Sequence, residues 1–146
     1  MGAAERGITL VELAIVLACS CVLLAAAVPG IQAIQQELAL WHDARLVESI
    51  LRWGRYHAVT ANEAVAFIVD EGGARCYFSI AATGEPCASS IRYMSRGVRV
   101  AGVPRRPVRF FPSGFAAPAG TYTLQGAAGA YRVVVQFSGR IRLQRD

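Results

Sequence analysis

The sequence predicts an α+β fold, in which one long N-terminal helix, partly transmembrane and partly amphipathic, packs on an antiparallel β-sheet. Two features predict the helix: an apolar run from Ile8 to Val28, and apolar residues at steps of three and four after Pro29. A third feature predicts the sheet, because the chain beyond His57 changes to short alternating runs bounded by glycine and proline. With 146 residues in all, the part beyond the apolar run suffices for one small domain.

The apolar run is long enough to span a membrane. It covers 21 residues, of which only Thr9, Glu12 and Ser20 are polar, and a helix of about 20 apolar residues crosses a hydrocarbon core. A charge inside such a span costs about 3 kcal/mol on insertion scales. Glu12, one turn inside the start of the run, is therefore a functional candidate. Pro29 follows the run and predicts a kink, because proline removes a backbone hydrogen bond and clashes with the preceding turn.

Beyond Pro29 the helix is expected to continue as an amphipathic segment to about His57. Polar residues, among them Asp43 and Glu48, occupy its other faces. The apolar residues form one stripe, which we expect to pack on the sheet: Ile31, Ile34, Leu38, Trp41, Ala44, Val47 and Leu51.

The remaining chain reads as short antiparallel strands. The first two, residues 64–69 and 75–80, are expected to form a hairpin around Gly72 and Gly73. Loops are expected at residues 83–86 and 112–120, where glycine and proline gather. Further strands are expected at residues 91–94, 98–103, 108–111, 121–124, 131–137 and 140–143.

Basic charge is concentrated in the C-terminal half. Between Ile8 and Glu71 three arginines stand against seven acids, whereas eleven arginines stand against two acids from Gly72 to Asp146. Such asymmetry indicates an anionic partner, such as nucleic acid, anionic lipid or an acidic protein surface. The alternative is that the charge only keeps the domain soluble. Alternation along a strand places Arg140 and Arg142 on one face, and Arg145, farther along the strand, nearly continues the alternation. We expect Arg132, on the neighbouring strand, and Arg105, Arg106 and Arg109 to widen the same patch.

The start of the chain resembles the leader of type IV pilins and type II secretion pseudopilins. The matching residues are Gly7-Ile8-Thr9-Leu10-Val11-Glu12, followed by the apolar helix. The resemblance implies that a prepilin peptidase cleaves between Gly7 and Ile8, that the new amine of Ile8 is methylated, and that Glu12 directs assembly. When Glu12 and the new cationic amine pair, each lowers the free-energy cost of placing the other's charge in lipid.

The C-terminal half resembles the GspH/FimT family of minor pilins. Phe111-Pro112-Ser113-Gly114, Tyr131-Arg132-Val133-Val134-Val135 and Gly139-Arg140-Ile141-Arg142 match it in order and spacing. The resemblance implies a pilin-like fold with a cleaved leader at 1–7, a transmembrane helix at 8–30, an amphipathic helix at 31–57 and a periplasmic β domain at 58–146.

This resemblance also implies a function. The first expectation is a GspH-type minor pseudopilin of a type II secretion system, anchored by a single pass in the bacterial inner membrane. Its partners would be the prepilin peptidase and other pseudopilins or pilins. The alternative is a FimT-like minor pilin that binds DNA during natural transformation, through Arg140, Arg142, Arg145 and Arg132.

Two other leader types compete with this interpretation. Val16-Leu17-Ala18-Cys19 loosely resembles a lipobox, and Ala25-Ala26-Ala27 offers small residues to ordinary signal peptidase. Both would place Glu12 inside the apolar region that these peptidases require, where a carboxylate weakens recognition.

The cysteines and histidines give no sign of catalysis. Cys19 and Cys21 point to different faces of a helix and cannot bridge each other. In an oxidising compartment, Cys76 and Cys87 are expected to form a disulfide; the alternative is two buried thiols. Neither His42 nor His57 has a nucleophile at a suggestive spacing, and no Cys/His set has zinc spacing. The sequence therefore predicts a protein that is not an enzyme and uses no metal or cofactor.

Overall fold

The computed structural model describes residues 9–146, which divide into two compact units, one ending at Gln35 and the other spanning Gln36–Asp146. Helix α1 (Leu10–Ala61) contributes to both units. The predicted leader at 1–7 and its cleavage point at Ile8 lie outside the described residues.

The N-terminal unit consists of the first part of α1. Its start is capped by Thr9, whose Oγ1 accepts a hydrogen bond from the backbone N–H of Glu12 at 3.2 Å. The hydroxyl of Ser20 donates to the carbonyl of Val16 at 2.8 Å, so this polar group is satisfied within the helix. The helix continues through Pro29. Its most apolar window of 18 residues has a mean hydropathy of 2.6, and none of these residues is buried. The segment is therefore a candidate membrane span.

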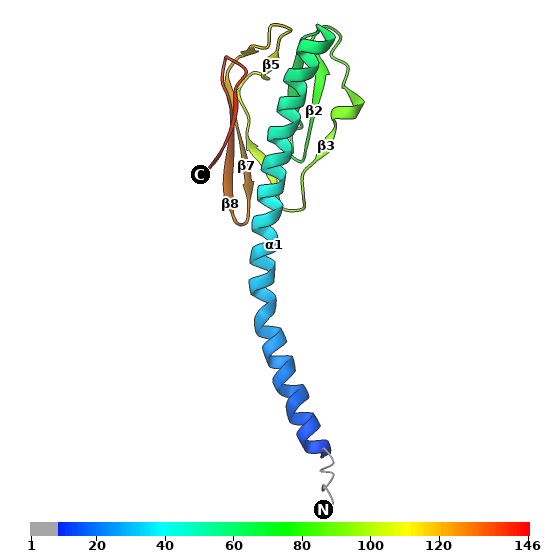
Figure 1. Ribbon diagram of the computed structural model, residues 1–146, viewed down its shortest axis with the longest axis vertical. Helices are drawn as coiled ribbons and strands as arrows, with labels where there is room; N and C mark the ends of the chain where they lie inside the picture. The colour runs from blue at the N-terminus through cyan, green and yellow to red at the C-terminus, as the bar shows by residue number, and fades with distance from the viewer. Residues whose placement is uncertain (1–8) are drawn as a thin grey trace, which may run out of the picture. The chain divides into compact units, whose positions relative to one another are not determined.

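The C-terminal unit contains two antiparallel sheets beside the second half of α1 (Figure 1). The first sheet has the strand order β3-β2-β1-β5-β6, formed by β1 (Val65–Val69), β2 (Arg75–Ile80), β3 (Arg92–Tyr93), β5 (Arg109–Phe110) and β6 (Ala116–Ala117). The second has the order β4-β7-β8-β9, formed by β4 (Arg99–Gly102), β7 (Gly120–Gly126), β8 (Gly129–Val135) and β9 (Ile141–Arg145). A short 3-10 helix, η1 (Ala88–Ser90), joins β2 to β3.

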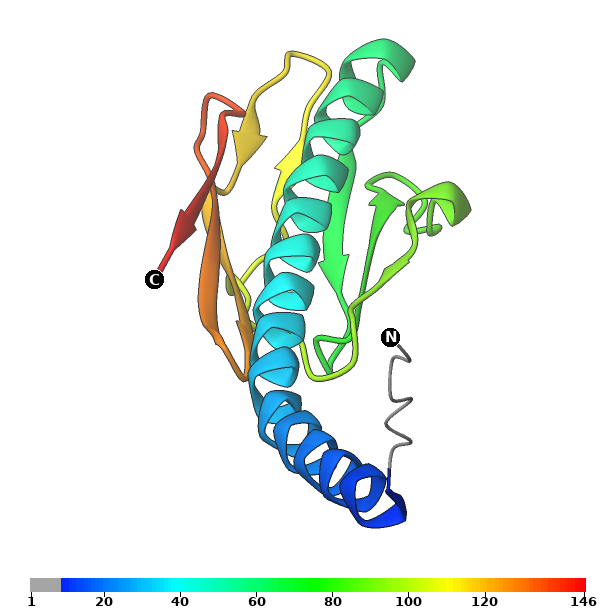
Figure 2. The ribbon, with the colours of Figure 1, turned by 60° about the horizontal axis from the view of Figure 1, so that its bottom comes forward.

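The core of this unit lies between the helix and both sheets (Figure 2). Phe67 and Phe78 of the first sheet contact each other at 5.2 Å between ring centroids, and Phe67 meets Tyr122 of the second sheet edge to face at 5.0 Å. Gly54 of α1 faces Phe78: a Cβ there would lie 2.1 Å from the Cζ of that ring. The absence of a side chain at Gly54 therefore lets the ring approach the helix backbone.

The predicted apolar stripe is confirmed in its C-terminal part and wrong before it. Ala44, Val47 and Leu51 are fully buried, whereas the four earlier residues, Ile31, Ile34, Leu38 and Trp41, are exposed. Leu40 is buried in their place, because the core-facing row runs through residues 40, 44, 47, 51, 54 and 58 at steps of four and three. Glycine and alanine at the last two positions kept this row from standing out as hydrophobic.

The helix also ends later than predicted, at Ala61 rather than about His57. Asn62 has a φ of 54°, and the N–H of Glu63 donates to the carbonyl of Ala58 at 3.2 Å. These are the left-handed residue and the closing bond of a Schellman cap. Ala58 is fully buried against the core, so tertiary packing holds this last turn in place.

The strand predictions are confirmed in outline. Residues 65–69 and 75–80 form the expected hairpin, and β7, β8 and β9 close the domain as antiparallel neighbours. The expected single sheet is in fact two, and β6 and η1 were missed. The two sheets separate because β4, the strand after β3, pairs with β7 instead of continuing the first sheet. This pairing joins residues far apart in sequence, so local alternation does not predict it.

Candidate functional site

Glu12 lies in the first turn of α1, where the sequence placed it. A carboxylate is favoured there because the helix N-terminus carries partial positive charge. The backbone N–H of Glu12 is bonded to the Thr9 cap, and Glu12 is exposed. Gly7 and Ile8, the residues expected to be cleaved and methylated, lie outside the described residues.

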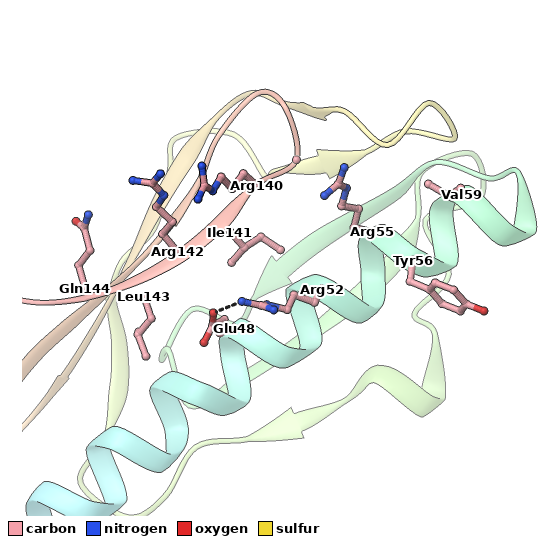
Figure 3. A pocket seen from close by; sticks show the side chains of 11 residues that line it. Glu48, Arg52, Arg55, Tyr56, Val59, Arg140, Ile141, Arg142, Leu143 and Gln144 are labelled. Atoms are coloured by element: carbon pink, nitrogen blue, oxygen red, sulfur yellow. Dashed lines mark hydrogen bonds and ion pairs between the residues drawn. The ribbon is translucent and has the colours of Figure 1, made fainter.

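A groove of about 790 Å³ opens between the second half of α1 and β9 (Figure 3). Its helix wall carries Glu48, Arg52, Arg55, Tyr56 and Val59. Its other wall is the turn after β8 and the strand that follows, residues 139–144. Two of the arginines that the sequence singled out, Arg140 and Arg142, therefore border this groove, together with the helix arginines Arg52 and Arg55, which the sequence analysis did not single out.

Gly139 and Arg55 both approach the carbonyl of Gly114 at one end of this groove. The Nε of Arg55 donates to the carbonyl of Gly114 at 3.0 Å. Gly139 has a φ of +74°, and a Cβ on it would lie 2.2 Å from that same carbonyl oxygen. Only glycine combines this left-handed conformation with so close an approach. The glycine of the Gly-Arg-x-Arg sequence therefore sets the position from which β9 departs.

The structure brings two of the predicted patch arginines together without acidic partners. Arg140 and Arg142 project from the same face of β9, away from the helix (Figure 3). Neither forms an ion pair within residues 9–146. Arg132 shares their face, since its neighbour on β9 is Gln144, but it pairs with Asp146.

The prediction that Arg145 extends this patch is wrong. Arg145 lies opposite Tyr131 on β9's other face, with its guanidinium 5.9 Å from the Tyr131 ring centroid. Its Nη1 lies 3.0 Å from the carboxylate of Glu37. Strand alternation explains the difference, because residue 145 is an odd number of positions from residues 140 and 142.

Glu48 contributes to the groove and was missed by the sequence analysis. Its residue is 6% exposed, and its carboxylate accepts hydrogen bonds from Arg45 at 3.0 Å and Arg52 at 2.7 Å. The dashed contact in Figure 3 is the second of these. Arginines three residues before and four residues after a glutamate are the sequence signal for such a pairing.

Of the two histidines, His57 packs on a neighbouring ring and His42 is exposed. The His57 ring stacks on Trp53 with 5.0 Å between centroids, and His42 Nδ1 lies 3.4 Å from the carboxylate of Asp43. Among the residues that the structure describes, no group of three His, Cys, Asp or Glu side chains could hold a metal ion.

Cys76 and Cys87 are both free thiols in the structure. The ladder neighbour of Cys76 is Arg92, while the N–H of Cys87 donates to the carbonyl of Phe78 at 2.7 Å. The two cysteines are therefore offset along β2 and do not face each other directly. The predicted disulfide is not formed here, and its formation in an oxidising compartment stays a prediction.

Thiol labelling of the globular unit Gln36–Asp146, which contains only these two cysteines, separates the two states. Burial raises the pKa of the Cys76 thiol to about 12, and only the thiolate reacts. In the reduced, folded unit at about pH 8, we expect Cys76 to alkylate at least about 100-fold more slowly than after unfolding. Cys87, which is only partly buried, should react first. If an unfolded sample prepared without reductant takes up no label, the two cysteines are bridged.

The fold and the position of Glu12 define the class: a pilin-like subunit with an apolar N-terminal helix and a globular β domain. The family model for type II transport protein GspH matches residues 43–139. The chain therefore belongs to the GspH family.

Solved structures show the same fold. Minor pseudopilin EpsH from the type 2 secretion system of Vibrio cholerae superposes with a TM-score of 0.58 at 17% identity, covering 73% of this chain and 96% of EpsH. Type IV minor pilin FimU of Pseudomonas aeruginosa strain PAO1 superposes with a TM-score of 0.62 at 18% identity, covering 76% of this chain and 92% of FimU. A search of curated protein sequences returned no match.

Proposed function

We propose that the chain is a GspH-type minor pseudopilin of a type II secretion system. The family match over residues 43–139 carries this proposal, and it is supported by the candidate membrane span at the start of α1. In this role the leader 1–7 is removed by prepilin peptidase and the amine of Ile8 is methylated. Residues 8–30 then hold the protein in the inner membrane, the helix of 31–57 continues the span, and the β domain of 58–146 lies in the periplasm.

Glu12 has a definite part in this proposal. A free amine at Ile8 would be a cation one turn from the Glu12 carboxylate, so either partner alone carries an unpaired charge in lipid. Pairing between the amine of an entering subunit and the Glu12 of a neighbour fixes their axial register, because the charges meet at only one offset of the two helices. The exposed position of Glu12 in the described helix leaves it accessible to such a neighbour.

Mature protein from a host with prepilin peptidase tests the proposal. Its mass should correspond to a chain that starts at Ile8 with a methylated amine; a start at Cys19 or Val28 would contradict the leader assignment. Glu12→Ala should be processed normally but recovered in sheared filaments at about one tenth of the parent level or less, since an unpaired charge costs about 3 kcal/mol. Glu12→Asp keeps the charge and should retain part of the assembly. Normal incorporation of the alanine variant would remove Glu12 from the mechanism.

A FimT-like minor pilin that binds DNA is the second candidate. It is favoured by one observation, the pair Arg140 and Arg142 on one face without acidic partners in residues 9–146. Guanidinium groups bind phosphates through two parallel hydrogen bonds and give affinity that falls with salt.

In this second case, a double-stranded oligonucleotide should bind the globular unit more weakly as salt rises. Arg140→Gln combined with Arg142→Gln should weaken binding at least about tenfold and lower the salt slope by about two. Arg145→Gln is the matched control, because Arg145 lies on the other face and pairs with Glu37. Equal binding by the parent and the double variant would rule out this face as the DNA site.

A further inference from the structure

We propose that the outer edge of β9 is a docking site for an extended acidic strand of a neighbouring protein, which adds to the sheet by β-augmentation. The inference rests on the proposed function in one respect: a subunit of a filament has neighbours that can supply such a strand. It names the surface and the chemistry of the partner segment, which the family assignment leaves open.

The first support is the hydrogen-bonding pattern of β9, which ends the second sheet. The N–H of Gln136 donates to the backbone carbonyl of Arg140 at 2.9 Å, and the N–H of Asp146 donates to the backbone carbonyl of Ala130 at 3.1 Å. In an antiparallel ladder the residues that bond their neighbour alternate, so positions 140, 142, 144 and 146 direct their backbone groups toward β8. Positions 141, 143 and 145 direct theirs away from β8, to the open edge of the sheet, where no strand within residues 9–146 pairs with them.

The second support is the chemistry of the surrounding side chains. Arg140 and Arg142 point to one side of β9, whereas Ile141 and Leu143 point to the helix side (Figure 3). The helix wall adds two further guanidinium groups, from Arg52 and Arg55. The walls therefore carry four arginines and one carboxylate, Glu48, and that carboxylate is already bonded to Arg45 and Arg52.

This arrangement selects the partner segment. A strand paired with β9 has its residues opposite those of β9 and about 5 Å away on the same face. Acidic side chains two residues apart would meet Arg140 and Arg142, and the apolar residues between them would cover Ile141 and Leu143. Pairing with β9 of a second copy would bring arginines against arginines. Charged side chains on an edge strand prevent such edge-to-edge pairing, because like charges repel. A duplex of nucleic acid would satisfy the arginines but not the outward backbone groups or the apolar side.

A peptide-binding experiment with the full-length protein in detergent micelles tests the proposal. The probe is a blocked, fluorescent peptide of about nine alternating glutamate and valine residues, long enough to cover the edge. We expect saturable binding, at least about tenfold tighter than that of the matched peptide alternating lysine and valine. On binding, exchange of the amide hydrogens at Ile141, Leu143 and Arg145 should slow at least about tenfold. Equal binding of both peptides, or unchanged exchange at these three amides, would overturn the proposal.

Two variants separate backbone pairing from simple charge attraction. Leu143→Pro removes an outward N–H without removing a ladder bond to β8, a position that proline tolerates on an edge strand. Leu143→Ala is its control, since it loses the same side chain but keeps the N–H. We expect the proline variant to bind the acidic peptide about fivefold more weakly than the alanine variant. Equal affinities would refute strand addition.

Charge and competing nucleic acid provide the remaining outcomes. Arg140→Gln with Arg142→Gln should weaken peptide binding at least about tenfold, and an unchanged affinity would refute the role of the arginines. If duplex DNA displaces the peptide and binds Leu143→Pro as well as Leu143→Ala, the face is a nucleic-acid surface and the proposal fails. The assay requires no filament, so its failure is distinguishable from a failure of leader processing or of Glu12-dependent assembly.

Discussion

Replacing Gly54 by alanine should lower the free energy of unfolding of the globular unit by about 1–3 kcal/mol. On helix propensity alone the same change would stabilise an exposed helix by about 1 kcal/mol. Here the new Cβ would lie 2.1 Å from Cζ and 2.5 Å from both Cε atoms of Phe78. That ring cannot withdraw easily, because it is fully buried and contacts Phe67, Phe110 and Trp53. The steric term therefore outweighs the propensity term.

Urea unfolding followed by circular dichroism measures this difference. Gly72→Ala is the matched control, since a Cβ at Gly72 meets nothing within 4 Å, and its stability should stay within about 0.5 kcal/mol of the parent. Combining Gly54→Ala with Phe78→Leu should cost less than the sum of the two single changes, because the smaller side chain makes room for the methyl group. A Gly54→Ala variant as stable as the parent would show that the helix and Phe78 separate freely.

The elements of this fold could be predicted because each depends on a local pattern. The apolar run, the steps of three and four in the helix, and the alternation in residues 75–80 each report their own periodicity. The end of the helix could not be placed in this way, because the buried residue of its last part, Ala58, is small and adds little to a hydrophobic pattern. Division into two sheets is likewise decided by which strand edges meet, as in the pairing of β4 with β7.

The candidate site was predictable only in part, for the same reason. Alternation correctly placed Arg140 and Arg142 on one face, whereas including Arg145 overlooked that it is an odd number of residues away. Arg52 and Arg55 reach the groove from a segment that is far away in sequence. A helical pattern of apolar residues also treats every polar side chain as exposed, so it cannot identify a carboxylate that is buried with its partners, as Glu48 is.

Asp43 is a second buried carboxylate of this kind, and replacing it by alanine should lower the free energy of unfolding by about 3 kcal/mol. Asp43 is 1% exposed. Its carboxylate accepts the backbone N–H of Ser95 at 2.6 Å and the hydroxyl of Ser95 at 2.9 Å. Hydrogen bonds to a charged group contribute about 1.5–3 kcal/mol each, and a buried donor left without a partner adds a desolvation cost. Asp43→Asn should cost less, because its amide oxygen can still accept one of these bonds.

The position of Ser95 explains why this one contact should matter to the whole unit. Ser95 lies between β3, an edge strand of the first sheet, and β4, an edge strand of the second. Asp43 therefore ties the helix to the segment where the chain passes from one sheet to the other. Ser95→Ala, which loses only the hydroxyl, should cost about 1 kcal/mol. In a double-mutant cycle Asp43→Ala and Ser95→Ala should be coupled by at least about 0.5 kcal/mol. Strictly additive effects would mean that the carboxylate stabilises the fold through groups other than Ser95.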